Sequence, residues 1–121
     1  MERWYLATLL ALILHQIDAA FWHEWGMFRV PGGIQGFLVF NLAAVGVLLH
    51  GYHQVALPKP SARAYARLCG VTGVGTAAIH VAFAIAGREE FHLPLSIAAL
   101  AACLIAGAGL LLSSRKPSTH Q

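Results

Sequence analysis

Four polar side chains stand inside long apolar stretches of this sequence, where ionisable groups are costly and usually serve a function. His15 and Asp18 are three residues apart in the first stretch, Asn41 lies in the second stretch and His80 in the third. At about 100° per residue, His15, Asp18 and Trp22 share one face of a helix. That face must point into a helical bundle, because a carboxylate facing lipid would cost about 3 kcal/mol.

The polar residues support three chemical interpretations. Two imidazoles and a carboxylate suit zinc, iron or copper, so His15, Asp18 and His80 are candidate metal ligands, and the two histidines could also bind haem axially. A carboxylate beside a histidine at low dielectric can bind a small ligand or handle protons, as a catalytic acid or base, with Asn41 orienting the pair. The third interpretation is structural, a network that only fixes helix register. The sequence requires no cofactor, and all three alternatives stay open.

His23 and Glu24 follow the first stretch, close to the expected membrane surface. We expect both to guard the outer mouth of the site, next to Trp22. They are not a zinc helix of the H-E-x-x-H type, because Met27 stands where the second histidine would be. Aromatic residues near them form the expected interfacial belt: Trp22, Trp25, Phe28 and Phe91.

Four apolar stretches must position these residues, and they cover about 5–22, 34–57, 68–87 and 93–112. Each is about long enough to cross a hydrocarbon core of about 30 Å. The chain is 58% hydrophobic and only 11% charged, too apolar for a soluble domain of this size. We therefore expect an all-α integral membrane protein. The expected fold is a four-helix up-down bundle forming one domain over residues 1–112, followed by a polar tail over 113–121.

Depth along the expected spans brings the polar residues to one layer. Counted from the outer end of each span at 1.5 Å per residue, Asp18 lies about 7 Å deep and His15 about 12 Å. Asn41 and His80 both come to about 10 Å on their own spans. Three helices thus present polar side chains at a common depth in the outer half of the membrane. We expect a buried site there.

The basic residues predict the orientation of the spans. Only Arg29 and Arg88 lie on the outer side, whereas the other six lie on the opposite side: Arg3, Lys59, Arg63, Arg67, Arg115 and Lys116. Because positive charge accumulates on the cytoplasmic side, we expect both chain ends and the second loop in the cytoplasm. Most acids fall on the outer side: Asp18, Glu24, Glu89 and Glu90. Nucleic-acid binding has no support, since the basic residues flank spans rather than line a face.

Small residues recur four apart in the last two stretches: Gly73 and Ala77; Ala98, Ala102 and Ala106; Cys103 and Gly107. This spacing lets helix backbones approach closely in lipid, where no hydrophobic force drives association. It fits packing within the bundle, or alternatively a homo-oligomer or a larger membrane complex formed through the third and fourth helices. The main rival to a binding site is therefore an accessory or scaffolding subunit, whose partners are the lipid bilayer and that complex.

A family likeness adds to this interpretation. It is carried by the following residues: His15-Gln16-Ile17-Asp18, Trp22-His23-Glu24-Trp25, Phe28 and Pro31-Gly32-Gly33-Ile34-Gln35-Gly36-Phe37. The pattern resembles a family of small bacterial four-helix membrane proteins with no assigned function, and it continues more loosely through Asn41, His80 and Phe91. The resemblance implies a bacterial cytoplasmic (inner) membrane protein with a shared H-x-x-D…W-x-E-W core. It supplies no reaction.

Overall fold

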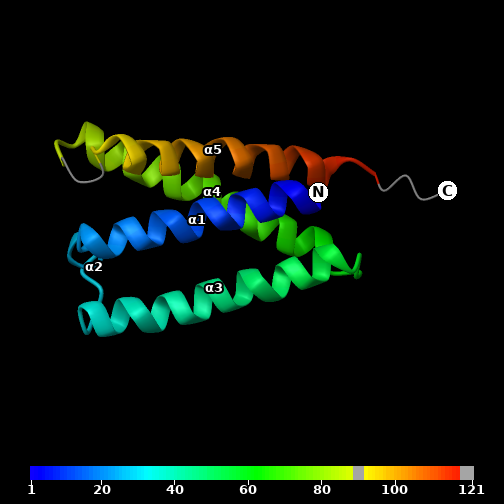
Figure 1. Cartoon of the computed structure of the whole chain (residues 1–121), viewed down its shortest axis with the longest axis horizontal. Helices are drawn as coiled ribbons and strands as arrows, with labels where there is room; N and C mark the ends of the chain where they lie inside the picture. Colours follow the sequence, from blue (N-terminus) through cyan, green and yellow to red (C-terminus); the bar gives the residue numbers. More distant parts are fainter. Residues whose placement is uncertain (89–91, 118–121) are drawn as a thin grey trace.

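The computed structural model describes residues 1–88 and 92–117, and these residues form an all-α bundle (Figure 1). The helices are α1 (Glu2–Phe21), the short α2 (Glu24–Met27), α3 (Ile34–Ala56), α4 (Ala62–Ile85) and α5 (Pro94–Arg115). Within the described ranges, four helices are long and apolar enough to cross a membrane. The predicted fold class, an integral membrane four-helix bundle, is confirmed.

Part of the sequence analysis concerns residues outside the described ranges. Glu89, Glu90 and Phe91, which we expected at the outer interface, are among them, as is the end of the expected tail over 118–121. The start of that tail is helical, since α5 continues to Arg115. The Ser114 hydroxyl donates to the Leu111 carbonyl at 2.8 Å, so this serine satisfies its polar group within the last helical turn.

The helices alternate in direction along the bundle (Figure 1). The start of α1 and the end of α5 lie at one end of the molecule, called here the terminal end. The short α2 lies at the opposite end, called here the α2 end. α1, α4 and α5 run close together, whereas α3 lies along the other side of α1.

The surface of the bundle is apolar and several polar groups are inside. Leu42, Ile85 and Leu95 are 78%, 84% and 84% exposed, whereas His15 and His80 are 1% and 6% exposed. The core is still mostly apolar, but the large apolar side chains on the surface are unlike those of a soluble domain. This surface suits a hydrocarbon environment, in which the polar groups must be satisfied within the protein.

The backbones of α4 and α5 touch along a seam of glycines. A Cβ atom on Gly107 would lie 2.9 Å from the Gly70 carbonyl oxygen and 3.1 Å from the Val74 nitrogen. A Cβ on Gly73 would lie 2.9 Å from the Cys103 carbonyl oxygen. Gly73 and Gly107 therefore serve packing within the bundle, as small-xxx-small spacing allows.

The terminal end is closed by a buried hydrogen bond between α1 and α3. The Tyr5 hydroxyl donates to the Leu48 carbonyl at 2.6 Å. Gly51 makes room for this contact, because a Cβ there would collide with the Tyr5 hydroxyl. The bond fixes α3 to α1 at this end of the molecule.

The glycine seam makes a prediction about stability. Gly73→Ala should lower the free energy of unfolding by about 1–3 kcal/mol, because the added methyl presses on the backbone of α5. The measurement is denaturant unfolding in detergent micelles, followed by circular dichroism. Gly75→Ala is the matched control, since a Cβ there meets nothing within 4 Å. Equal losses in both variants would contradict the seam.

Candidate functional site

His15 on α1 and His80 on α4 meet inside the bundle, near the α2 end. Their ring centroids are 4.5 Å apart and the ring planes stand at 81°, an edge-to-face contact. Both side chains are almost fully buried. The depth counted along the two spans predicted this approach, and the structure brings the two predicted residues together.

Glu24 of α2 lies between the two histidines. Its Oε2 atom is 3.7 Å from the His15 Nε2 atom, and its Oε1 atom is 3.6 Å from the His80 Nε2 atom. The residue is 8% exposed, so it lies inside the site and not at an open mouth as expected from the sequence. Glu24 therefore supplies the carboxylate that faces both imidazoles.

A left-handed turn at His23 carries Glu24 into the bundle. α1 ends at Phe21, and His23 adopts φ 55° and ψ 49°, a conformation that non-glycine residues rarely take. The His23 ring stays exposed and stacks on Trp25, with centroids 4.8 Å apart and planes at 19°. His23 thus acts on the site through the backbone, because its left-handed conformation turns the chain between the end of α1 and the start of α2, which carries Glu24.

The tautomer of His80 follows from its partner on α4. The Thr76 carbonyl oxygen, 2.7 Å from Nδ1, can only accept, so Nδ1 carries the hydrogen and donates it. In the neutral ring the Nε2 atom then has a lone pair directed at the Glu24 carboxylate. Two acceptors face each other there, and a proton or a cation between them turns the contact into an attraction.

Burial, and to a smaller extent the nearby Asp18 carboxylate, together raise the pKa of Glu24 to about 7. Removal from water is the larger cause, because it disfavours the charged form. The carboxyl of Glu24 therefore holds its charge less readily than an exposed glutamate does. Positive charge placed beside it, or a proton on it, stabilises the site.

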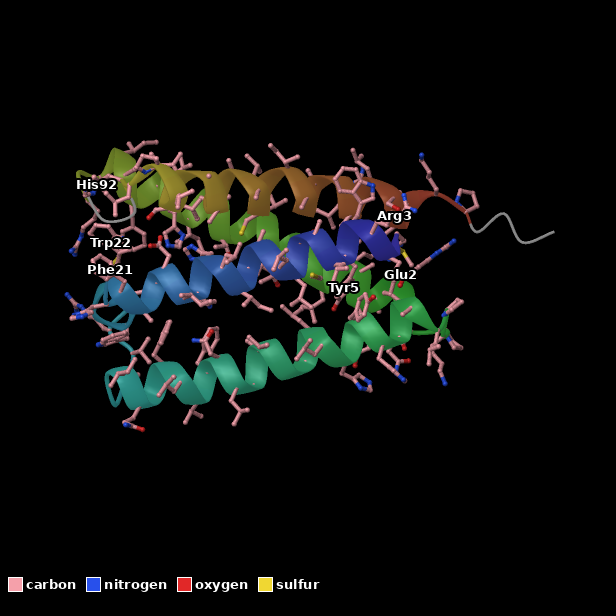
Figure 2. The ribbon with its side chains drawn as sticks, in the orientation of Figure 1. Glu2, Arg3, Tyr5, Phe21, Trp22 and His92 are labelled. Carbon is pink, nitrogen blue, oxygen red and sulfur yellow. The ribbon has the colours of Figure 1, made fainter. Side chains whose placement is uncertain are left out.

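Asp18 lies beside this cluster and has a partner of its own. Its Oδ1 atom accepts a hydrogen bond from the Trp22 indole nitrogen at 3.1 Å. The Trp22 ring also packs edge-on against the His92 ring, with ring centroids 5.3 Å apart. Both residues are labelled at the α2 end in Figure 2. The sequence placed Asp18 and Trp22 on one helix face, and they are hydrogen-bonded there. The catalytic role given to Asp18 stays a prediction.

The side-chain amide of Asn41 makes a hydrogen bond within its own helix, α3. Its Nδ2 atom donates to the Phe37 carbonyl at 2.9 Å, which fixes the orientation of the amide. The Asn41 side chain lines the same cavity as His15 and His80, described next. Its role in orienting the two histidines stays a prediction.

A cavity of about 360 Å³ opens beside the cluster and extends between α1, α3 and α4. Most of its wall is apolar: Leu9, Leu12, Ile13, Trp25, Phe28, Val30, Phe37, Phe40, Ala44, Val45, Leu48 and Ile79. A further cavity of about 360 Å³ shares Phe40, Ala44, Leu48 and Thr72 with it and lies between α3 and α4. The size suits a small organic molecule, for which sites of 300–1,000 Å³ are typical.

Three buried acceptor atoms line this cavity from three elements. They are Oε1 of Gln16, Oε2 of Glu24 and Oδ1 of Asn41, and within the described residues none accepts a hydrogen bond. Buried polar atoms are satisfied in the great majority of cases, so three together mark a place where donors are needed. The sequence analysis missed Gln16, whose only signal was its position next to His15.

The turn at His23 makes a prediction about stability. His23→Val should lower the free energy of unfolding by about 2 kcal/mol relative to His23→Gly, because a β-branched residue opposes the left-handed conformation and glycine does not. Both substitutions remove the stacking on Trp25, so their difference isolates the backbone. Unfolding in detergent micelles gives the comparison, and equal stability would show that the turn does not depend on this conformation.

Comparison with known proteins gives a family and no function. Comparisons with curated proteins and with solved structures gave no match. A family model, described as a family of unknown function (DUF6713), matches residues 1–117. That range includes all five described helices, and with them the cluster and the cavity. The chain therefore belongs to this family of unknown function, DUF6713.

Proposed function

We propose that this chain is a multi-pass protein of the bacterial cytoplasmic membrane that binds a small, largely apolar molecule through a head group that donates hydrogen bonds. The observation that carries the proposal is the set of three buried acceptors, on Gln16, Glu24 and Asn41, in the wall of an otherwise apolar cavity. An apolar cavity with a few convergent polar groups is the usual form of a small-molecule site.

The wall of the cavity favours an apolar body for the ligand. Leucine, isoleucine, valine and aromatic side chains from α1, α3 and α4 make most of it, and they offer a hydrocarbon chain the contacts it has in lipid. The neighbouring cavity continues toward Val47 and Leu68, each 46% exposed on the surface that would meet the acyl chains. A ligand dissolved in the bilayer therefore has a route between α3 and α4.

The polar end of the cavity favours a hydroxyl or amine head. Carboxylate and amide oxygens accept hydrogen bonds, so a head group with O–H or N–H bonds satisfies them. A phosphate or carboxylate head would instead place acceptor against acceptor beside Glu24. Burying unsatisfied polar atoms costs about 1–3 kcal/mol for each group, which gives this selectivity its energetic basis.

The charges at the two ends of the bundle favour one orientation. Arg63 donates to the Lys116 carbonyl at 3.1 Å, at the terminal end, where most of the basic residues of the sequence lie. By the positive-inside rule, these charges favour a cytoplasmic terminal end, which would put the α2 end and the cluster in the outer half of the membrane.

Photolabelling in lipid nanodiscs tests the proposal. Dodecanol carrying a diazirine group should label Leu12, Phe40 or Thr76, which line the cavity, and unlabelled dodecanol should compete. Dodecyl phosphate should not compete, because its head group does not satisfy the three acceptors. Peptide mass spectrometry locates the label and measures the saturable fraction.

Two substitutions on α3 provide the contrast. Ala44→Trp fills the cavity and should remove the saturable labelling, whereas Leu42→Trp, on a side chain that is 78% exposed, should leave it unchanged. Labelling confined to the outer surface, or equal in both variants, would favour the rival function, an accessory subunit whose polar residues only hold the bundle together.

A further inference from the structure

We propose that His15, Glu24 and His80 form a binding site for one divalent transition-metal ion of the zinc class. One ligand atom from each residue can be chosen so that the three atoms all lie within 4.8 Å of one another, and all three residues are buried. Two imidazole nitrogens and one carboxylate make a donor set that suits zinc or iron. The three residues come from α1, α2 and α4, so the folded bundle assembles the set.

The distances suit a shared ion after a small adjustment. Zinc binds nitrogen and oxygen at about 2.0–2.1 Å, so two donors of a tetrahedral ion lie about 3.4 Å apart. The Glu24 oxygens are 3.7 Å from Nε2 of His15 and 3.6 Å from Nε2 of His80, each close to that spacing. The widest pair, within 4.8 Å, would have to close by up to about 1.4 Å when an ion binds.

The surroundings of His80 match those of a metal ligand. A metal-binding histidine donates its other ring N–H to a carbonyl or a carboxylate, which fixes the ring and directs the free lone pair at the ion. The Nδ1–H of His80 donates to the Thr76 carbonyl at 2.7 Å, and its Nε2 atom faces Glu24. α4 is itself held against α5 by the glycine seam, so the ligand stands on a fixed element.

The charges of the cluster also call for a cation. The Glu24 carboxyl group and the two imidazole rings converge in a place shielded from water, with each Glu24 oxygen within 3.7 Å of one imidazole nitrogen. A divalent ion between the carboxylate and the two nitrogen lone pairs attracts all three groups. At low dielectric such attraction is far stronger than at an exposed site.

The metal site shares Glu24 with the proposed organic-ligand site, but it does not rest on that proposal. It needs only the three side chains. Because His15, Glu24 and His80 all line the cavity, a three-ligand site leaves its open coordination position facing that space. A hydroxyl or amine bound in the cavity would then meet the ion directly.

Cobalt binding to the tag-free protein in detergent micelles tests the proposal. Co²⁺ has visible absorption bands that are intense in tetrahedral sites, and zinc should displace it. The expected result is one equivalent of Co²⁺ bound per chain, with those bands. His80→Gln and Glu24→Gln should each weaken binding by more than about 100-fold, because each removes a ligand and not merely an outer contact.

A variant that lacks a ligand could lose Co²⁺ binding simply because it unfolds. Two further variants and the wild-type protein therefore complete the test. His53→Ala removes an exposed histidine of α3 and should bind Co²⁺ like the wild type. Asp18→Asn should change the affinity by no more than about tenfold, because Asp18 is already bonded to Trp22. Absence of tetrahedral Co²⁺ bands in the folded wild-type protein would overturn the proposal. Loss of those bands in Asp18→Asn but not in Glu24→Gln would also overturn it.

Discussion

Burying the Glu24 carboxylate is the constraint on which the α2 end of the molecule depends. An ionised carboxylate removed from water costs several kcal/mol unless partners or positive charge compensate it. His15 approaches one carboxylate oxygen and His80 the other, so a proton or a cation shared between the carboxylate and these imidazoles would compensate the charge. For both contacts to form, α1 must end at Phe21 and the chain must reverse at His23. The strained turn and the buried acid are thus two parts of one arrangement.

The rest of the bundle divides into a rigid part and a more open part. α4 and α5 touch backbone to backbone at Gly73 and Gly107, so the helix that carries His80 packs directly on its neighbour. α3 is held at the terminal end by the hydrogen bond from Tyr5 to Leu48 and at the α2 end by Phe37, which packs against Trp25 at 5.4 Å. Between these two contacts the cavity separates α3 from the other helices. The fold therefore combines a fixed pair of histidines with a space beside them.

Helical periodicity and span length predict much of this architecture. They predict four long helices, and a simple depth count brings His15 and His80 to the same layer, because both lie on continuous helices where position is a linear function of sequence. The position of Glu24 cannot be predicted by such a depth count, because the chain turns at His23 before it reaches Glu24. No pattern in the sequence indicates that His23 adopts a left-handed conformation. The sequence analysis therefore assigned the carboxylate of the cluster to Asp18, because Asp18 is the nearest carboxylate to His15 on a straight helix.

Polar groups at the two ends of the bundle separate a structural role from a binding role. At the terminal end the Tyr5 hydroxyl and the Leu48 carbonyl match one donor with one acceptor, as a contact that only fixes helix register requires. At the α2 end the side-chain oxygens of Gln16, Glu24 and Asn41 face one cavity with no donor among the described residues. A network that served stability alone would gain by filling this space with apolar side chains, because unsatisfied acceptors are worse than none. Retaining acceptors around a cavity makes physical sense when donors or a cation come from outside the chain.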